Sequence, residues 1–248
     1  MIALERVAIV MTNNVEKERT MKYAIALATI AAAGSVASAN LTITELYAGM
    51  SGEDGTLDWI EVTNTGSSSM NTGIFYYDDE NPSINDGGLL DSMTLGAGES
   101  AIFLISDDNV ASDDVLYSSA IQEFNSIWNY TGQIGLTNGG GNLGQGGDGA
   151  FLLSGTSGSE VIESSAVFSS GFENLNATID FTSGSAMLSV LGLNGGYESE
   201  SFFNDNLGLP GDQATIIGSI GLVPTPGSAS LLIIGGLVGM RRRRTVNS

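Results

Sequence analysis

Three carboxylates on two adjoining segments are the side chains of this chain that are best spaced to do chemistry. Glu45 lies within residues 41–47, and Asp58 and Glu61 lie within residues 57–63. Apolar and polar residues alternate along both segments, which is typical of strands. Hard cations prefer several oxygen ligands, so these three carboxylates could together form a calcium-type site.

Strand alternation predicts the surroundings of these carboxylates. It places Ile43, Glu45 and Tyr47 on one face of the first strand, and Trp59 and Glu61 on one face of the second. A carboxylate among large apolar residues needs partners. Two interpretations therefore stand. In the first, which we favour, Glu45 and Glu61 accept hydrogen bonds from backbone N–H groups of loops and so brace those loops. In the second, the carboxylates bind a cation.

The distribution of charge limits which partners these carboxylates can have. The chain carries a net charge of −20, and no Lys, Arg or His lies between Lys22 and Arg241. Salt bridges between side chains are therefore excluded from the middle of the chain. Nucleic acid is excluded as a partner as well, because phosphate binding needs Lys or Arg to displace counterions. Self-repulsion opposes compaction and is relieved by salt, which indicates a salty or divalent-rich habitat.

Catalytic groups are scarce in this composition. Cys and His are absent, and Lys occurs only near the N-terminus, so the usual nucleophiles and bases are missing. A two-carboxylate glycoside-acting enzyme is chemically possible, but no spacing marks a pair. The acidic runs at 78–80, 107–108 and 113–114 lack the spacing of an EF-hand and are interpreted as solvated loops. The Gly-rich stretch 139–148 is interpreted as a hairpin turn.

Four aromatic residues could stack on sugar rings, and they support an alternative function as a carbohydrate-binding module. They are Tyr76, Tyr77, Trp128 and Tyr130. Aromatic residues of a sandwich more often pack in the core or in turns, so this function is the second choice.

Short strand patterns recur along the middle of the chain between clusters of Gly, Ser, Asn and Asp. This spacing predicts an all-β fold, an antiparallel sandwich or barrel. No helical periodicity of useful length is expected outside the two end segments, and residues 115–130 are left open between a short helix and an irregular excursion. The expected strands cover residues 41–47, 57–63, 74–77, 92–95, 100–105, 133–136, 150–153, 160–168, 185–193 and 214–220.

The N-terminal region has the pattern of a secretory signal peptide at residues 21–39. Lys22 supplies its positive charge, and an apolar run too short to span a bilayer follows. Ala37 and Ala39 are the small residues expected at the cleavage site, so the mature chain is predicted to begin at Asn40. Residues 1–20 do not resemble a signal peptide and are interpreted as an upstream annotation extension.

The C-terminal segment 222–244 combines a proline motif, a 13-residue apolar run and a block of Arg. The Arg block follows the positive-inside rule. The arrangement resembles the PEP-CTERM sorting signal, which implies recognition by an exosortase-type protease. Thr225 stands where that family usually has Glu, and a plain C-terminal membrane anchor is the alternative. The motif residues are Val223, Pro224, Pro226, Arg241, Arg242, Arg243 and Arg244.

Residues 40–221 are expected to form one domain, and motifs along them resemble the lamin tail domain of secreted bacterial proteins. Five pieces carry the resemblance in order: Ile43-Thr-Glu45-Leu46, Asp58-Trp-Ile-Glu61-Val-Thr-Asn64, the Leu95-Gly-Ala-Gly98-Glu turn, the Gly-rich stretch from Leu136 to Leu153, and Gly208-Leu-Pro210-Gly211. The resemblance implies an immunoglobulin-like antiparallel β-sandwich that binds or supports and does not catalyse.

Together these patterns predict a secreted, non-enzymatic, structural or adhesive protein. It is expected to leave the cell by the Sec pathway and to reside at the outer cell surface or in the exopolysaccharide matrix, with transient anchoring in the inner membrane. Expected partners are the sorting protease, exopolysaccharide or envelope components, the membrane, and calcium as the possible ion.

Overall fold

The computed structural model describes residues 41–50, 54–80, 82–106, 114–144, 146–172, 175–204 and 213–221. The chain divides into two units, residues 1–38 and 39–248, and every described residue belongs to the second. The predicted extension 1–20, the signal peptide 21–39 and the sorting segment 222–244 lie outside the described residues. Within the described ranges, no helix is both long and apolar enough to cross a membrane.

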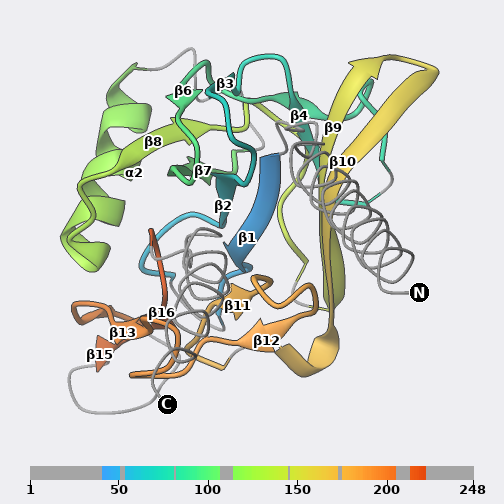
Figure 1. Cartoon of the computed structure of the whole chain (residues 1–248). Helices are drawn as coiled ribbons and strands as arrows, with labels where there is room; N and C mark the ends of the chain where they lie inside the picture. The colour runs from blue at the N-terminus through green and yellow to red at the C-terminus, as the bar shows by residue number, and fades with distance from the viewer. Residues whose placement is uncertain are drawn as a thin grey trace, which may run out of the picture. The chain divides into compact units, whose positions relative to one another are not determined.

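A six-stranded sheet forms the centre of the fold (Figure 1). Its strand order is β12-β11-β1-β2-β7-β8. In that order the strands span Met187–Leu188, Ile179–Asp180, Leu41–Tyr47, Trp59–Asn64, Ser100–Leu104 and Gln133–Leu136. The bounds of β1 and β8 are those expected from the sequence.

A four-stranded sheet of order β10-β9-β4-β5 contains the long β9–β10 hairpin (Figure 1). These strands span Ser159–Ser169, Gly147–Thr156, Tyr76–Asp78 and Gly88–Leu89. Three two-stranded ribbons complete the strands of the described residues. They pair β13 (Tyr197–Glu198) with β16 (Ile217–Gly218), β14 (Phe202–Phe203) with β15 (Gln213–Ala214), and β3 (Met70–Asn71) with β6 (Thr94–Leu95).

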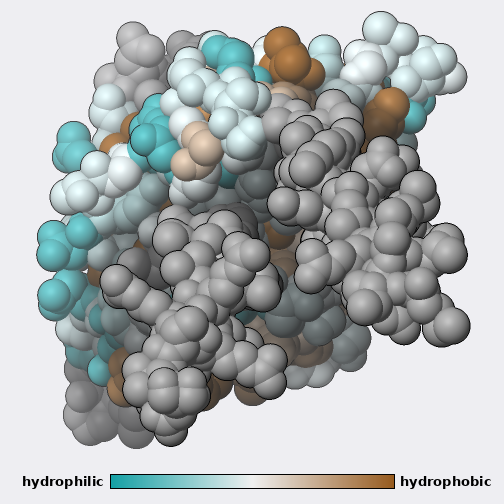
Figure 2. Space-filling model, in the orientation of Figure 1, coloured by the Kyte–Doolittle hydropathy of each residue, from teal (hydrophilic) through white to brown (hydrophobic). Residues whose placement is uncertain are grey.

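Two apolar clusters lie on opposite faces of the six-stranded sheet. The first joins it to the four-stranded sheet, for example Val62 and Phe103 with Leu152. The second joins it to the helix α2 and to the C-terminal strands, for example Trp59 with Trp128 and Ile216. Every residue of β2 is buried because both faces of the sheet are covered. The fold is therefore all-β and sandwich-like. In Figure 2 its visible described surface is mostly teal to white, with several brown apolar patches.

A β-bulge between Ile43 and Glu45 changes the alternation expected for β1. Ile43 joins the cluster between the two sheets, whereas Tyr47 joins the cluster on the opposite face. The expectation that Ile43, Glu45 and Tyr47 share a face is therefore wrong for Ile43. The extra residue of a bulge shifts the side-chain register by one, which a strict period of two does not anticipate.

The helix α2, Asp114–Trp128, decides between the two alternatives that the sequence left open for residues 115–130. Its residues Ala120, Ile121, Phe124, Ile127 and Trp128 contribute to the second cluster and recur at helical spacing. The helix connects β7 to β8, which pair in parallel. Parallel neighbours need a crossover of a dozen or more residues, and α2 lies within that crossover. The pairing of β7 with β8 departs from the antiparallel arrangement that the sequence predicted.

The Gly-rich stretch after β8 is not the expected hairpin turn. β8 belongs to the six-stranded sheet and β9 to the four-stranded sheet, so the stretch passes from one sheet to the other. Its backbone turns at Asn138 and Gly139–Gly141, all of which have positive φ. Glycine adopts this conformation without strain, so the Gly-rich sequence correctly predicted a turn. The prediction that this turn joins two paired strands was wrong, because β8 and β9 belong to different sheets.

The C-terminal part contains shorter strands than the sequence pattern predicted. Of residues 185–193, only β12 is a strand, and residues 214–220 are divided between β15 and β16. The remaining residues of both segments lie outside strands, and Ser189 and Ser219 among them are donors of the candidate site described next.

Candidate functional site

Glu45 and Glu61 lie directly opposite each other on the two central strands. The antiparallel register of β1 and β2 pairs Glu45 with Glu61 and Tyr47 with Trp59. Both carboxylates are 1% exposed. The described residues contain no cationic side chain, so hydrogen bonds must compensate for the lost hydration of these groups.

Four hydrogen bonds from three segments converge on Glu45. Its Oε1 accepts from the hydroxyl of Thr178, from the hydroxyl of Ser189 at 3.1 Å and from the backbone N–H of Ser219 at 2.8 Å. Its Oε2 accepts from the hydroxyl of Ser219 at 3.0 Å. Both oxygens therefore have donors, and Glu45 joins the segments after β10, after β12 and after β16 to the centre of the sheet.

Glu61 has one side-chain donor and one backbone donor. Its Oε1 accepts from the hydroxyl of Thr44 at 2.6 Å, and its Oε2 accepts from the backbone N–H of Gly221 at 2.5 Å. Thr44 is the residue at the bulge of β1, and its hydroxyl also lies 2.9 Å from that of Thr63. The Thr63 hydroxyl lies 2.8 Å from that of Ser100, so a row of hydroxyls leads from Glu61 along the sheet.

Burial raises the pKa of both carboxyl groups. For Glu61, burial and then the charge of Glu45 raise the pKa from 4.5 to about 7, against the hydrogen bonds from Thr44 and Gly221. For Glu45, burial also raises the pKa, and the donors Thr178, Ser219 and Ser189 lower it by less. Two facing carboxyls disfavour double ionisation, so the pair holds a proton near neutral pH.

Asp58 is not hydrogen-bonded to this pair. Its Oδ2 accepts from the backbone N–H of Leu143 at 3.1 Å, and its carbonyl accepts from the N–H of Ile105. Within the described ranges, no group of three or more Asp, Glu, His or Cys is arranged to hold a metal ion. The structure therefore brings Glu45 and Glu61 together without Asp58, and a cation at these three residues remains only a prediction from sequence.

The expected backbone brace is confirmed at both carboxylates by the N–H groups of Ser219 and Gly221. Sequence reasoning did not find the hydroxyl donors Thr44, Thr178 and Ser189. Thr44 lies within the Ile43–Leu46 motif, but the motif does not mark it as a donor. Thr178 and Ser189 gave no signal, because they lie 133 and 144 residues from Glu45.

The proposed sugar-stacking residues do not form an exposed platform. Tyr77 is fully buried, and Trp128 is 2% exposed. Trp128 packs edge-on against Trp59, with ring centroids 6.0 Å apart, and against Tyr197 at 5.8 Å. Tyr77 belongs to the opposite apolar cluster. Tyr77 and Trp128 are therefore core residues, as the preferred interpretation of these aromatic residues expected, whereas Tyr76 and Tyr130 are half-buried.

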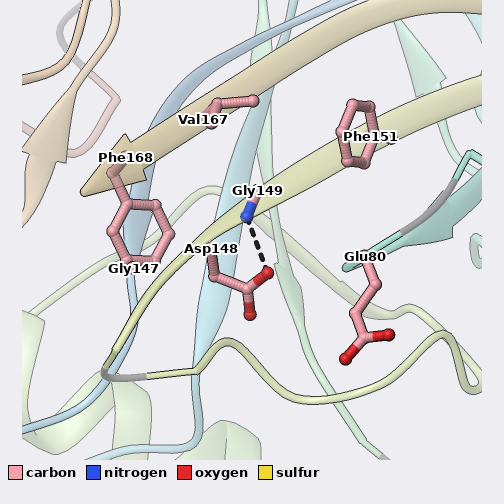
Figure 3. Close-up of a pocket in the computed structure, with 7 residues that line it drawn as sticks. All are labelled: Glu80, Gly147, Asp148, Gly149, Phe151, Val167 and Phe168. Atoms are coloured by element: carbon pink, nitrogen blue, oxygen red, sulfur yellow. Dashed lines mark hydrogen bonds between the residues drawn. The ribbon is translucent and has the colours of Figure 1, made fainter. Parts of the chain in front are cut away.

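A second acidic region lies at an open hollow of about 400 Å³ beside the β9–β10 hairpin (Figure 3). Phe151, Val167 and Phe168 line one part of it, and the carboxylates of Glu80 and Asp148 line the other. Asp148 accepts the backbone N–H groups of Gly144 at 2.6 Å and Gly149 at 2.8 Å, as expected of a carboxylate that braces a turn.

Asp79 belongs to the same acidic region. Burial, followed by the charge of Asp148, raises its pKa to about 6. The neighbouring Asp78 accepts backbone N–H bonds from Ser83 and from Asp79 itself. In the acidic run at 78–80, Asp78 therefore stabilises the loop that follows it by accepting its N–H groups. The run at 107–108 and residue 113 lie outside the described residues.

No protein-family model matches this chain, and no curated protein or solved structure matches it either.

Proposed function

We propose that this chain is a secreted structural or adhesive domain that is held at the bacterial surface by its C-terminal segment. In this proposal, residues 21–39 direct export and residues 222–244 sort or anchor the protein. The domain between them is an immunoglobulin-like sandwich of the lamin-tail type, and it does no catalysis.

One observation gives the strongest support to a structural role that resists mechanical force. The last described residues, Ser219 and Gly221, donate their backbone N–H groups to Glu45 and Glu61 on the two central strands. The chain enters the proposed sorting segment directly afterwards. A pull on a surface-anchored C-terminus therefore reaches the middle of the six-stranded sheet through buried hydrogen bonds and bypasses the short edge strand β12.

Charge supports the proposed location in the matrix. The domain is strongly acidic, and its described part carries no cationic side chain. Divalent ions would screen its self-repulsion and could link its surface carboxylates to anionic exopolysaccharide. In this proposal calcium acts as a counter-ion at the surface.

Cell fractionation with intact-mass analysis tests the location and both processing events. The expected product begins at Asn40 and is found in the envelope or matrix fraction. Replacing Arg241–Arg244 with Ser should reduce its retention at the surface, and a chelator should release part of the wild-type protein. An uncut protein in the cytosol would refute the proposal.

A further inference from the structure

Four large apolar side chains project into solvent from one short segment at the β12 edge of the six-stranded sheet. They are Met187, Val190, Leu191 and Leu193, which are 52%, 49%, 57% and 60% exposed. We refer to these four residues as the apolar loop. Single exposed apolar residues are ordinary on a protein surface, but four within seven positions form a patch that needs an explanation.

Hydrogen bonds within the loop hold these side chains outward. The N–H of Leu193 donates to the carbonyl of Val190, and the N–H of Gly196 donates to the carbonyl of Leu193. The N–H of Gly192 closes the loop onto the carbonyl of Gly196. Gly192, Asn194 and Gly195 adopt positive φ, which suits these residue types in turns. The exposure therefore belongs to an ordered loop.

The loop is also free of charge in a strongly acidic chain. No Asp, Glu, Lys or Arg occurs from Phe181 to Tyr197. Of the two flanking carboxylates, Asp180 is 8% exposed and accepts the N–H of Thr182, whereas Glu198 is exposed and accepts the hydroxyl of Thr215. A surface that approaches anionic lipid head groups must avoid carboxylates, because like charges repel at short range.

The loop lies beside the place where the chain leaves the described fold. Ser219 lines the same small hollow as Met187, Val190 and Leu193. The strand β16, which ends at Gly218, pairs with β13, which directly follows the loop (Figure 1). The apolar run of the C-terminal segment begins at Ser228, so the connecting chain can span at most about 30 Å.

We propose that the apolar loop contacts the lipid bilayer in which the C-terminal segment is anchored. The inference rests on the proposed membrane location of that segment and adds a second, peripheral contact on the folded domain. The short connection keeps Ser219 near the membrane, and the loop is the apolar surface next to it. Its uncharged side chains enter the interfacial layer, as apolar groups of peripheral proteins do.

The absence of Cys allows a direct test on the full-length chain. Leu193→Cys carries an environment-sensitive fluorophore, and the protein is reconstituted into phosphatidylethanolamine–phosphatidylglycerol vesicles that contain a lipid-attached quencher. Val161→Cys, on β10, is the matched control because Val161 is 53% exposed. Leu232→Cys reports on the anchor segment. Quenching at Leu193 should exceed quenching at Val161 at least threefold.

The outcomes separate this inference from the proposed function. Quenching at Leu232 without quenching at Leu193 overturns the loop contact and leaves the anchor standing. Quenching at neither position overturns both. A blue-shifted Leu193 probe that needs protein concentration and no lipid would show that a second copy covers the loop, which also overturns the proposal.

A substitution series gives an independent measurement. The triple variant Val190→Ser, Leu191→Ser, Leu193→Ser should lower the fraction of protein bound to the same vesicles at least threefold under limiting lipid. Val161→Ser, Ile162→Ser, Val167→Ser removes comparable exposed apolar side chains from β10 and should change binding less than twofold. Equal losses in both variants would contradict a specific role for the loop.

Discussion

Carboxylates lie close together in two regions of this molecule, and the described residues include no cationic side chain to neutralise them in either region. The two regions differ in which groups stabilise the negative charge. Glu45 and Glu61 are 1% exposed and are bound by hydroxyl and backbone donors from distant segments. Glu80 and Asp148 face an open hollow, where the donors to Asp148 among the described residues are the N–H groups of Gly144 and Gly149 (Figure 3). In the buried pair, donors from distant segments replace the missing cation, whereas at Asp148 the donors come from the loop around it. Asp78 lies between these cases, because it is 3% exposed and is bound by N–H groups of its own loop.

The largest expected effect is that of pH on the buried pair. The pKa of Glu61 is raised to about 7 in the folded protein, so the folded state holds a proton that the unfolded chain releases above about pH 4.5. Stability is therefore fully present below pH 4.5 and is lost as the pH rises through 7. We expect a loss of about 2–3 kcal/mol between pH 5 and pH 8, measured by chemical denaturation.

Glu61→Gln should remove most of this pH dependence. The amide oxygen can still accept the N–H of Gly221, and the NH₂ group can donate to the hydroxyl of Thr44. Glu200→Gln, which makes the same change at an exposed position, is the control and should retain the wild-type slope. Stability that increases with pH over this range would contradict the account.

Removal of a long-range donor should have the next largest effect. In Thr178→Val the shape is kept but the hydroxyl that donates to Glu45 is lost. The free energy of unfolding should fall by about 1–3 kcal/mol, because a buried acceptor loses a partner. Thr182→Val is the control: Thr182 is exposed, and its change should stay within about 0.5 kcal/mol. A loss in Thr178→Val that is larger at pH 8 than at pH 5 would show that the ionised form needs this donor.

Salt should act on the open region and leave the buried pair largely unaffected. Raising NaCl from about 50 mM to about 500 mM shortens the Debye length to about 4 Å and screens exposed charges. We expect this salt increase to stabilise the wild type, and Asp148→Asn to reduce the gain. Glu61→Gln should leave the gain unchanged. The measurement is thermal unfolding at pH 8, and an equal response of both variants would remove the distinction between the two regions.

Calcium should give the smallest effect at the buried pair. The oxygens of Glu45 and Glu61 already accept hydrogen bonds, so calcium would have to compete with these donors. At constant ionic strength, calcium should change the Tm of the wild type and of the double variant Glu45→Gln, Glu61→Gln by the same amount. A calcium shift that disappears in this double variant would instead support the cation site predicted from the sequence.

Local patterns predicted much of the sheet but not how its layers are connected. Alternation of apolar and polar residues located β1 and β8 with their correct bounds, although both faces of the central strands are buried. It could not predict the bulge beside Thr44, where one extra residue reverses the faces. For residues 115–130 the sequence left a short helix and an irregular excursion open, although the spacing of Phe124, Ile127 and Trp128 is that of one helix face.

The sequence by itself determined the electrostatic rule of this protein. With no Lys, Arg or His from residue 23 to residue 240, any buried carboxylate of the domain must be bound by N–H and O–H groups. Only the tertiary structure decided which groups these are. Thr178, Ser189, Ser219 and Gly221 lie 133 to 174 residues from the carboxylates that they bind, and only folding brings them together. A sequence period reports which face of an element is buried, whereas the partner across that face is chosen by packing between segments that are distant in the chain.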